Sequence, residues 1–109
     1  LDMWKGCAIT GVKRPELVRA SHIKPWRMSS NVERLDPDNG LLLLPQYDHL
    51  FDAGYISFDD KGRLLESPAI QNIPPAVLGF ERGVHLRKVN DRHRKFLEFH
   101  RDKLFLRSA

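Results

Sequence analysis

The residues with the greatest potential for chemistry are a histidine, an asparagine and two aspartates within residues 20–54. His22 lies in a β-prone run, Asn39 precedes an apolar run, and Asp48 and Asp52 follow in a segment of helical character. A neutral imidazole accepts a proton readily near pH 7. Aspartates at positions i and i+4 share one helix face, so their carboxylates can meet a single cation. The pattern therefore pairs a candidate base with two candidate cation ligands.

Three short strands are predicted in the first half of the chain. Residues 6–10 form a β-prone run closed by a glycine, and residues 20–24 form a second run that Pro25 stops. Residues 41–44 are four consecutive leucines, which is typical of a strand buried on both faces. A single helical turn is expected after Ser30, between the second and third strands.

Helices and a hairpin are predicted to follow. Pro45 suits the first position of a helix over residues 46–52, and Gly54 is placed to cap its end. Residues 55–66 read as a β-hairpin. A C-terminal helix is expected from the cap Asn90 to about residue 106, with a core-facing stripe of Phe96, Leu97, Phe99, Leu104 and Phe105.

Four segments in this order resemble the ββα-metal core of HNH endonucleases. They read ASHIKPW at residues 20–26, ERLDPDNGLLL at 33–43 and YDHLFDAGYISF at 47–58, preceded by CAITG at 7–11, which is similar to the start of this domain in bacterial HNH proteins of the modification-dependent restriction type. The resemblance implies an α+β fold of the HNH or His-Me finger type. We expect one domain over residues 1–109, with the ββα-metal core at about 20–54, an additional β-hairpin and a C-terminal helix.

The resemblance also implies a role for each of these residues. His22 would be the general base that activates water for attack on a phosphodiester. Asn39 would bond the loop backbone and so orient His22. The family places a metal ligand nine residues after the asparagine, and in some members another four residues later, which are the positions of Asp48 and Asp52. The cation would neutralise the leaving oxygen.

Two positions depart from the family pattern. Ser21 stands where an aspartate or histidine ligand usually precedes the catalytic histidine. Asp48 replaces the helix histidine, and the adjacent His49, turned about 100° round the helix, is the alternative ligand. With fewer strong ligands, we expect a loosely held Mg²⁺ or Mn²⁺ as the cofactor, with Zn²⁺ or Ni²⁺ as alternatives.

The positive charge is concentrated near the C-terminus. Residues 81–109 hold nine basic and four acidic side chains, whereas residues 1–80 hold nine basic and ten acidic ones. This asymmetry favours a polyanion partner, although a solvated helix face neutralised by neighbouring acids is an alternative. Near the site, Trp26 either stacks on a base or sugar or packs under its loop. The candidate nucleic-acid contacts are Lys24, Arg27, Arg34, Arg92 and Lys95.

Composition narrows the function classes further. No apolar run is long enough to cross a bilayer, and the single cysteine, Cys7, excludes an intramolecular disulfide framework and fits a reducing, cytoplasmic compartment. We expect a DNA-cleaving module of a bacterial restriction or defence nuclease, without membrane contact. A recognition domain fused or associated on the N-terminal side and a homodimer are the expected partners. The alternatives are a DNA-binding module that has lost catalysis and a generic interaction domain.

Overall fold

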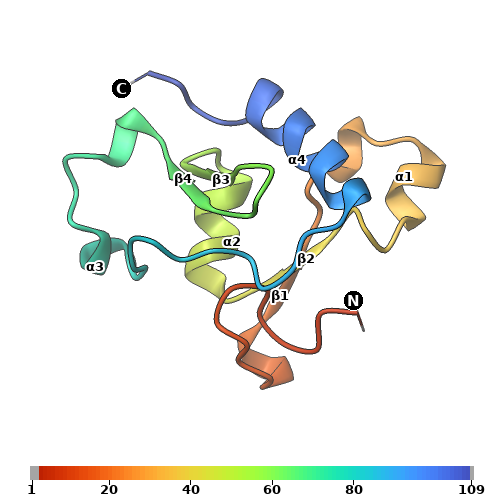
Figure 1. The fold of residues 1–109 in the computed structure, drawn as a ribbon, viewed down its shortest axis with the longest axis horizontal. Helices are drawn as coiled ribbons and strands as arrows, with labels where there is room; N and C mark the ends of the chain where they lie inside the picture. Colours follow the sequence, from red (N-terminus) through yellow and green to blue (C-terminus); the bar gives the residue numbers. More distant parts are fainter. Residues whose placement is uncertain (1–2, 109) are drawn as a thin grey trace.

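Two short antiparallel hairpins, each packed against a helix, make up most of the fold, which the computed structural model describes for residues 3–108 (Figure 1). None of the helices in that range is long and apolar enough to cross a lipid bilayer. In chain order the elements are η1 (Pro15–Leu17), β1 (Arg19–Ser21), η2 (Trp26–Met28), α1 (Asn31–Leu35), β2 (Leu41–Leu43), α2 (Pro45–Asp52), β3 (Ile56–Phe58), β4 (Leu64–Glu66), η3 (Pro68–Ile70), α3 (Pro75–Leu78) and α4 (Asp91–Lys103).

The first hairpin and α2 form the ββα unit that was predicted. β1 pairs antiparallel with β2, so that Ala20 lies opposite Leu42. Pro45 opens α2 directly after β2, where its missing N–H costs no hydrogen bond. α2 then packs back across the hairpin and buries Leu50 and Phe51 in the core. This α+β arrangement confirms the expected fold class.

β1 is shorter than the predicted strand over residues 20–24, because it ends at Ser21. The backbone N–H of Lys24 donates to the side chain of Asn39 at 2.8 Å, and the Lys24 carbonyl accepts from the same side chain at 3.3 Å. The Asn39 side chain thus forms the hydrogen bonds that the Lys24 backbone would form with a neighbouring strand if β1 were longer. The strand prediction was correct in place and wrong in length.

The predicted strand at residues 6–10 is wrong, because this segment forms tight turns. Gly6 and Gly11 have φ angles of 121° and 79°, which an extended strand does not accommodate. The Cys7 N–H donates to the Val12 carbonyl at 2.8 Å, closing the turn on itself. One bond, from the Ala8 N–H to the Leu42 carbonyl at 2.5 Å, ties the turn to β2.

The second hairpin, β3 with β4, was predicted, and in the structure it packs against α4. Asn90 caps α4 by accepting from the His93 N–H at 2.8 Å. The helix ends at Lys103, earlier than the predicted 106, because the next residues turn back towards α2. There the Leu106 N–H donates to the Gly54 carbonyl at 2.9 Å.

Gly54 allows this close approach between the end of α2 and the chain that follows α4. Its φ of 83° is the left-handed conformation that caps a helix, and a Cβ at this position would lie 2.2 Å from the Leu104 carbonyl oxygen. In the predicted stripe of α4, Phe96 and Leu97 are buried, while Phe99, Leu104 and Phe105 are half-buried. The C-terminal helix is therefore an integral part of the core.

Candidate active site

A cleft of about 480 Å³ lies where the end of β1 faces α2, and it contains the imidazole and both carboxylates singled out in the sequence. His22 stands directly after β1, whereas Asp48 and Asp52 project from α2 one turn apart. His22 and Asp52 are exposed, and Asp48 is half-buried. The other lining residues are Ala20, Ser21, Pro25, Trp26 and Arg27. The ββα unit thus brings residues that are far apart in sequence to one solvent-accessible hollow.

The imidazole of His22 is oriented by a single polar contact among the described residues, between Nε2 and the Arg34 carbonyl at 3.4 Å. A carbonyl only accepts hydrogen bonds, so Nε2 carries the hydrogen in this contact. In the neutral ring Nδ1 then keeps a lone pair. His22 is exposed to solvent, and this nitrogen is the one able to accept a proton.

Asn39 is 1% exposed and its side chain is fully bonded within the loop that follows His22. Its oxygen accepts from the Lys24 N–H, and its nitrogen lies 3.2 Å from the Glu33 carbonyl, 3.3 Å from the Lys24 carbonyl and 3.4 Å from Ser29 Oγ. These contacts join η2 and α1 to the residue two places beyond His22. The carboxamide therefore fixes the chain direction just after the imidazole.

His49 lies outside the set of residues that line the cleft with His22. It is exposed on α2, whose buried face carries Tyr47, Leu50 and Phe51. Because consecutive helix positions differ by about 100°, an imidazole next to Asp48 points along a different face. The helix therefore presents Asp48 and Asp52 to the cleft in preference to His49.

The donors in the cleft suit a hard cation that keeps much of its water. Two carboxylates on one helix face offer oxygen ligands, and Ser21 beside them is 6% exposed. Within residues 3–108 there is no cluster of three or more His, Cys, Asp or Glu side chains arranged to hold a metal ion. Tight zinc sites use three or four protein ligands, whereas Mg²⁺ is commonly held by one or two carboxylates. The donor set therefore fits Mg²⁺ or Mn²⁺ better than Zn²⁺.

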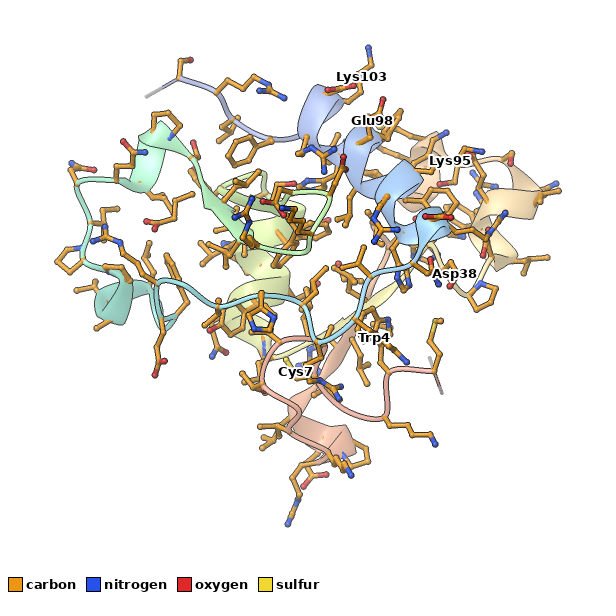
Figure 2. All side chains as sticks on the ribbon, viewed as in Figure 1. Trp4, Cys7, Asp38, Lys95, Glu98 and Lys103 are labelled. Atoms are coloured by element: carbon orange, nitrogen blue, oxygen red, sulfur yellow. The ribbon has the colours of Figure 1, made fainter. Side chains whose placement is uncertain are left out.

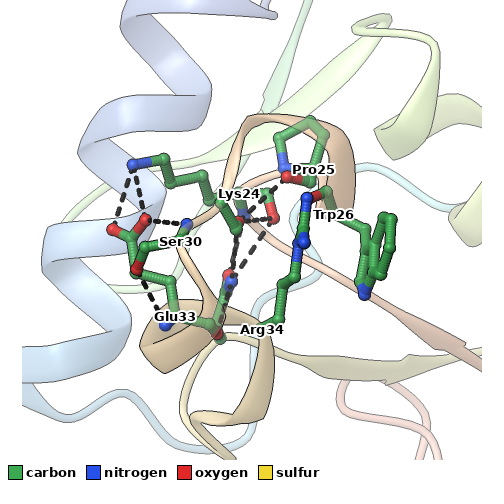
Figure 3. A network of polar contacts seen from close by, with 8 residues as sticks. Lys24, Pro25, Trp26, Ser30, Glu33 and Arg34 are labelled. Carbon is green, nitrogen blue, oxygen red and sulfur yellow. Dashed lines mark hydrogen bonds and ion pairs between the residues drawn. The ribbon is translucent and has the colours of Figure 1, made fainter.

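Trp26 and Arg34 form a stacked pair beside the cleft (Figure 3). The guanidinium carbon of Arg34 lies 3.7 Å from the centre of the Trp26 ring, and Arg34 Nε donates to the Trp26 carbonyl at 2.8 Å. Trp26 is 58% exposed, so it does not pack under its loop. Arg27, next to it, is exposed and lines the cleft.

Besides Arg34, two more of the predicted nucleic-acid contacts are engaged within the protein. Lys24 Nζ lies 2.9 Å from a Glu33 carboxylate oxygen (Figure 3), and it also sits over the Phe99 ring. Arg92 pairs with Asp36 and lies 3.5 Å from a second carboxylate, that of Asp38. The Arg92 guanidinium holds the pKa of Asp36 below its usual range. Both cations thus connect the loop around Asn39 to other parts of the fold.

Lys95 is the second member of the predicted set on α4, and it is exposed, as Arg92 is. Figure 2 shows Lys95, Glu98 and Lys103 along α4. Lys95 lines a separate hollow with Lys24, Glu33 and Glu98. The structure therefore places this lysine outside the cleft that holds His22.

Two buried histidines on α4 were missed by sequence reasoning. His100 is 1% exposed, with Nδ1 at 2.8 Å from Ser57 Oγ and Nε2 at 2.8 Å from the Phe51 carbonyl. Burial lowers the pKa of His100 to about 4, so the ring is neutral near pH 7 and Nε2 donates to the carbonyl. Its spacing from Phe96 and Leu97 places it on the apolar helix face, which is the signal that reveals it.

The second buried histidine, His93, anchors the start of α4 to the N-terminal segment. Its ring stacks on Trp4 with centroids 5.2 Å apart, and Trp4 Nε1 donates to the Gly40 carbonyl at 2.8 Å. Burial lowers the pKa of His93, against the opposing effect of the nearby Asp38 carboxylate. Gly40 directly follows Asn39, so α4 braces the segment that carries the loop asparagine.

Comparisons with known proteins identify a family for the first half of the chain. Residues 7–59 match the family model described as HNH endonuclease. A solved structure described as "Modification dependent TagI restriction endonuclease" is similar over 80% of this chain, with 20% identity and a TM-score of 0.49. The chain spans 27% of the length of that protein. No curated protein sequence gives a significant match. Through residues 7–59, which include His22, Asn39, Asp48 and Asp52, the chain belongs to the HNH endonuclease family.

Proposed function

We propose that this chain hydrolyses DNA phosphodiester bonds with the help of Mg²⁺ or Mn²⁺, with His22 as general base. The observation that carries the proposal is the single cleft lined by His22, Asp48 and Asp52. A base facing two carboxylates across a hollow open to solvent can receive a phosphate between them. The lone pair on His22 Nδ1 agrees with this role.

In the proposed reaction, His22 Nδ1 removes a proton from water as the water oxygen attacks phosphorus. The bond between phosphorus and the 3′ oxygen then breaks, and that oxygen leaves with the electron pair and is protonated from solvent. Asp48 and Asp52 would hold the cation, which when bound supplies charge neutralisation at the leaving oxygen. Arg27, exposed in the same cleft, would bind a non-bridging phosphate oxygen.

Plasmid nicking tests this proposal. In Mg²⁺ or Mn²⁺ the His22→Ala variant should nick supercoiled plasmid about 100-fold or more slowly than the parent, because general-base catalysis contributes about 10²–10⁴ in rate. His85→Ala is the matched control, since His85 is exposed and belongs to the segment before α4. Unchanged nicking by His22→Ala would remove His22 as the base.

The second candidate is a DNA-binding module on the same fold without catalysis. The buried Ser21 at a usual ligand position and the lack of a three-ligand cluster in residues 3–108 favour this alternative. It predicts salt-dependent DNA binding and no nicking with any divalent cation. Nicking by the parent that is lost in His22→Ala would exclude it.

The proposal also covers the kind of protein and cell in which this domain acts. We place the chain in a cytoplasmic restriction or defence nuclease of a bacterium, next to a domain that recognises DNA. A cut through both strands needs two active sites, which a homodimer would supply. Analytical ultracentrifugation with and without a short duplex tests the dimer, because a monomer in both conditions contradicts it.

A further inference from the structure

A second hollow, of about 780 Å³, adjoins the active-site cleft across Ala20. It is lined by Lys5, Gly6, Lys13, Pro15, Val18, Ala20 and Leu42. Ala20 lies on β1 two residues before His22, and it lines both hollows. Its side chain is exposed and small, and it is the residue that the two hollows share.

The cations of this second hollow are Lys5 and Lys13, which are exposed on the N-terminal turns. Among residues 3–108 neither lysine has an acidic partner within ion-pair distance. The arginines of α4 differ, because Arg92, Arg94 and Arg101 each pair with an aspartate. Lys5 and Lys13 are therefore two of the cations left for an external anion, and they lie beside Ala20.

Lys5 is also held in an unfavourable backbone conformation. Its φ is 49°, and it is the one non-glycine residue in 3–108 with a positive φ. Glycine or asparagine adopts this conformation at lower cost. The guanidinium of Arg87 keeps the turn in place by donating to the carbonyls of Trp4, Gly6 and Cys7 at 2.6, 3.2 and 2.9 Å. Strained residues that the surroundings hold in this way cluster at ligand-binding sites.

We propose that Lys5 and Lys13 each bind a backbone phosphate of the substrate DNA, on the strand that passes over Ala20 into the active-site cleft. This inference rests on the proposed function for its substrate class. Lysine ammonium groups on flexible stems act as point charges for phosphates, and the apolar floor of Val18, Ala20 and Leu42 suits a sugar. The site fixes the register of the strand and carries no base recognition.

The salt dependence of DNA binding tests the site directly. Binding of a short fluorescent duplex is measured from low to moderate salt in a metal chelator, so that no cleavage occurs. Lys5→Asn with Lys13→Gln should reduce the slope of log K against log salt by about 2, because each lost phosphate contact removes about 0.9. The matched control is Lys61→Gln with Lys103→Gln, which removes equal charge from the β3–β4 turn and the end of α4.

An equal change in both double variants would mean that only the overall charge matters, which overturns the site. An unchanged slope in the Lys5 and Lys13 variant overturns it as well. Plasmid nicking by His22→Ala judges the catalytic proposal separately, since binding in chelator requires no chemistry. A reduced slope together with active His22→Ala would therefore support the phosphate site and reject the proposed base.

Thermal unfolding of the single variant Lys5→Asn separates binding from folding. Asparagine tolerates a positive φ, so this variant should unfold at the same temperature as the parent or higher, while its DNA affinity falls. A lower unfolding temperature would show that Lys5 serves the fold, and would overturn the argument from backbone strain.

Discussion

The side chain of Asn39 bonds both the N–H and the carbonyl of Lys24, at 2.8 and 3.3 Å, as a neighbouring strand would. This contact ends β1 and directs the chain into the loop of η2 and α1. His22 lies between the end of the strand and this contact, so its position is set from both sides.

Asn39→Asp should therefore weaken both the fold and the reaction. The carboxylate keeps an acceptor for the Lys24 N–H, but it cannot donate to the carbonyls of Lys24 and Glu33. We expect the free energy of unfolding to fall by about 2 kcal/mol in urea denaturation. Nicking should fall at least about tenfold at a temperature where the variant is folded. Asn31→Asp, on the exposed start of α1, is the isosteric control, and equal effects in both variants would contradict the role of Asn39.

The cation concentration that nicking requires should distinguish the three candidate metal ligands on α2, which are Asp48, Asp52 and His49. Asp48→Asn and Asp52→Asn should each raise the Mn²⁺ concentration for half-maximal nicking by about tenfold or more, because each loses a carboxylate in the cleft. His49→Ala should change it little. Calorimetric titration with Mn²⁺ checks the result without cleavage. A large effect of His49→Ala alone would identify His49 as the ligand instead.

Stability should decrease in mild acid because of His100. Burial lowers its pKa to about 4 in the folded chain, whereas the unfolded histidine titrates near the usual 6.5. Between these values the unfolded state binds more protons, so stability is complete above pH 6.5 and falls as the pH approaches 4. The shift corresponds to about 3 kcal/mol. Urea denaturation between pH 7 and 4.5 measures this loss of stability. The His100→Gln variant should show a flatter dependence of stability on pH. An unchanged dependence in that variant would contradict the assignment.

Two arginines should differ in their contribution to DNA binding. Arg27 is exposed in the cleft, so Arg27→Gln should reduce the slope of log K against log salt by about 1. Arg92 is already paired with Asp36 and Asp38, so Arg92→Gln should reduce the slope by less. Both measurements use the same duplex in chelator. A larger effect of Arg92→Gln would show that it leaves its aspartates to bind DNA.

Short-range signals in the sequence correctly predicted where α2, α4 and the second hairpin lie. Pro45 and Asn90 mark the starts of α2 and α4, and the turn after residue 58 marks the second hairpin. Spacing alone placed Asp48 and Asp52 on one helix face. The family resemblance is what connected these aspartates with His22. The cleft that contains all three side chains depends on how the strands and helix pack, which local sequence patterns do not describe.

Contacts between distant residues account for what sequence reasoning missed. The run at residues 6–10 has β-prone side chains, but the left-handed glycines at its ends and the Arg87 bonds fold it into turns. Counting charges near the C-terminus overlooked the pairing of Arg92 with an aspartate fifty-six positions earlier. His93 and His100 looked polar in the sequence, yet each is 1% exposed.

The bonds from Arg87 to the carbonyls around Gly6 determine how many residues a transferable form of this domain must include. The HNH match ends at residue 59, but Arg87 holds the turn before β1 and His100 holds the end of α2. A fragment cut at the boundary of the match would expose Phe51 and Phe58 and release the first turn. Grafting this domain onto a DNA-targeting protein therefore requires the chain to continue to about residue 106, where Leu106 closes on Gly54.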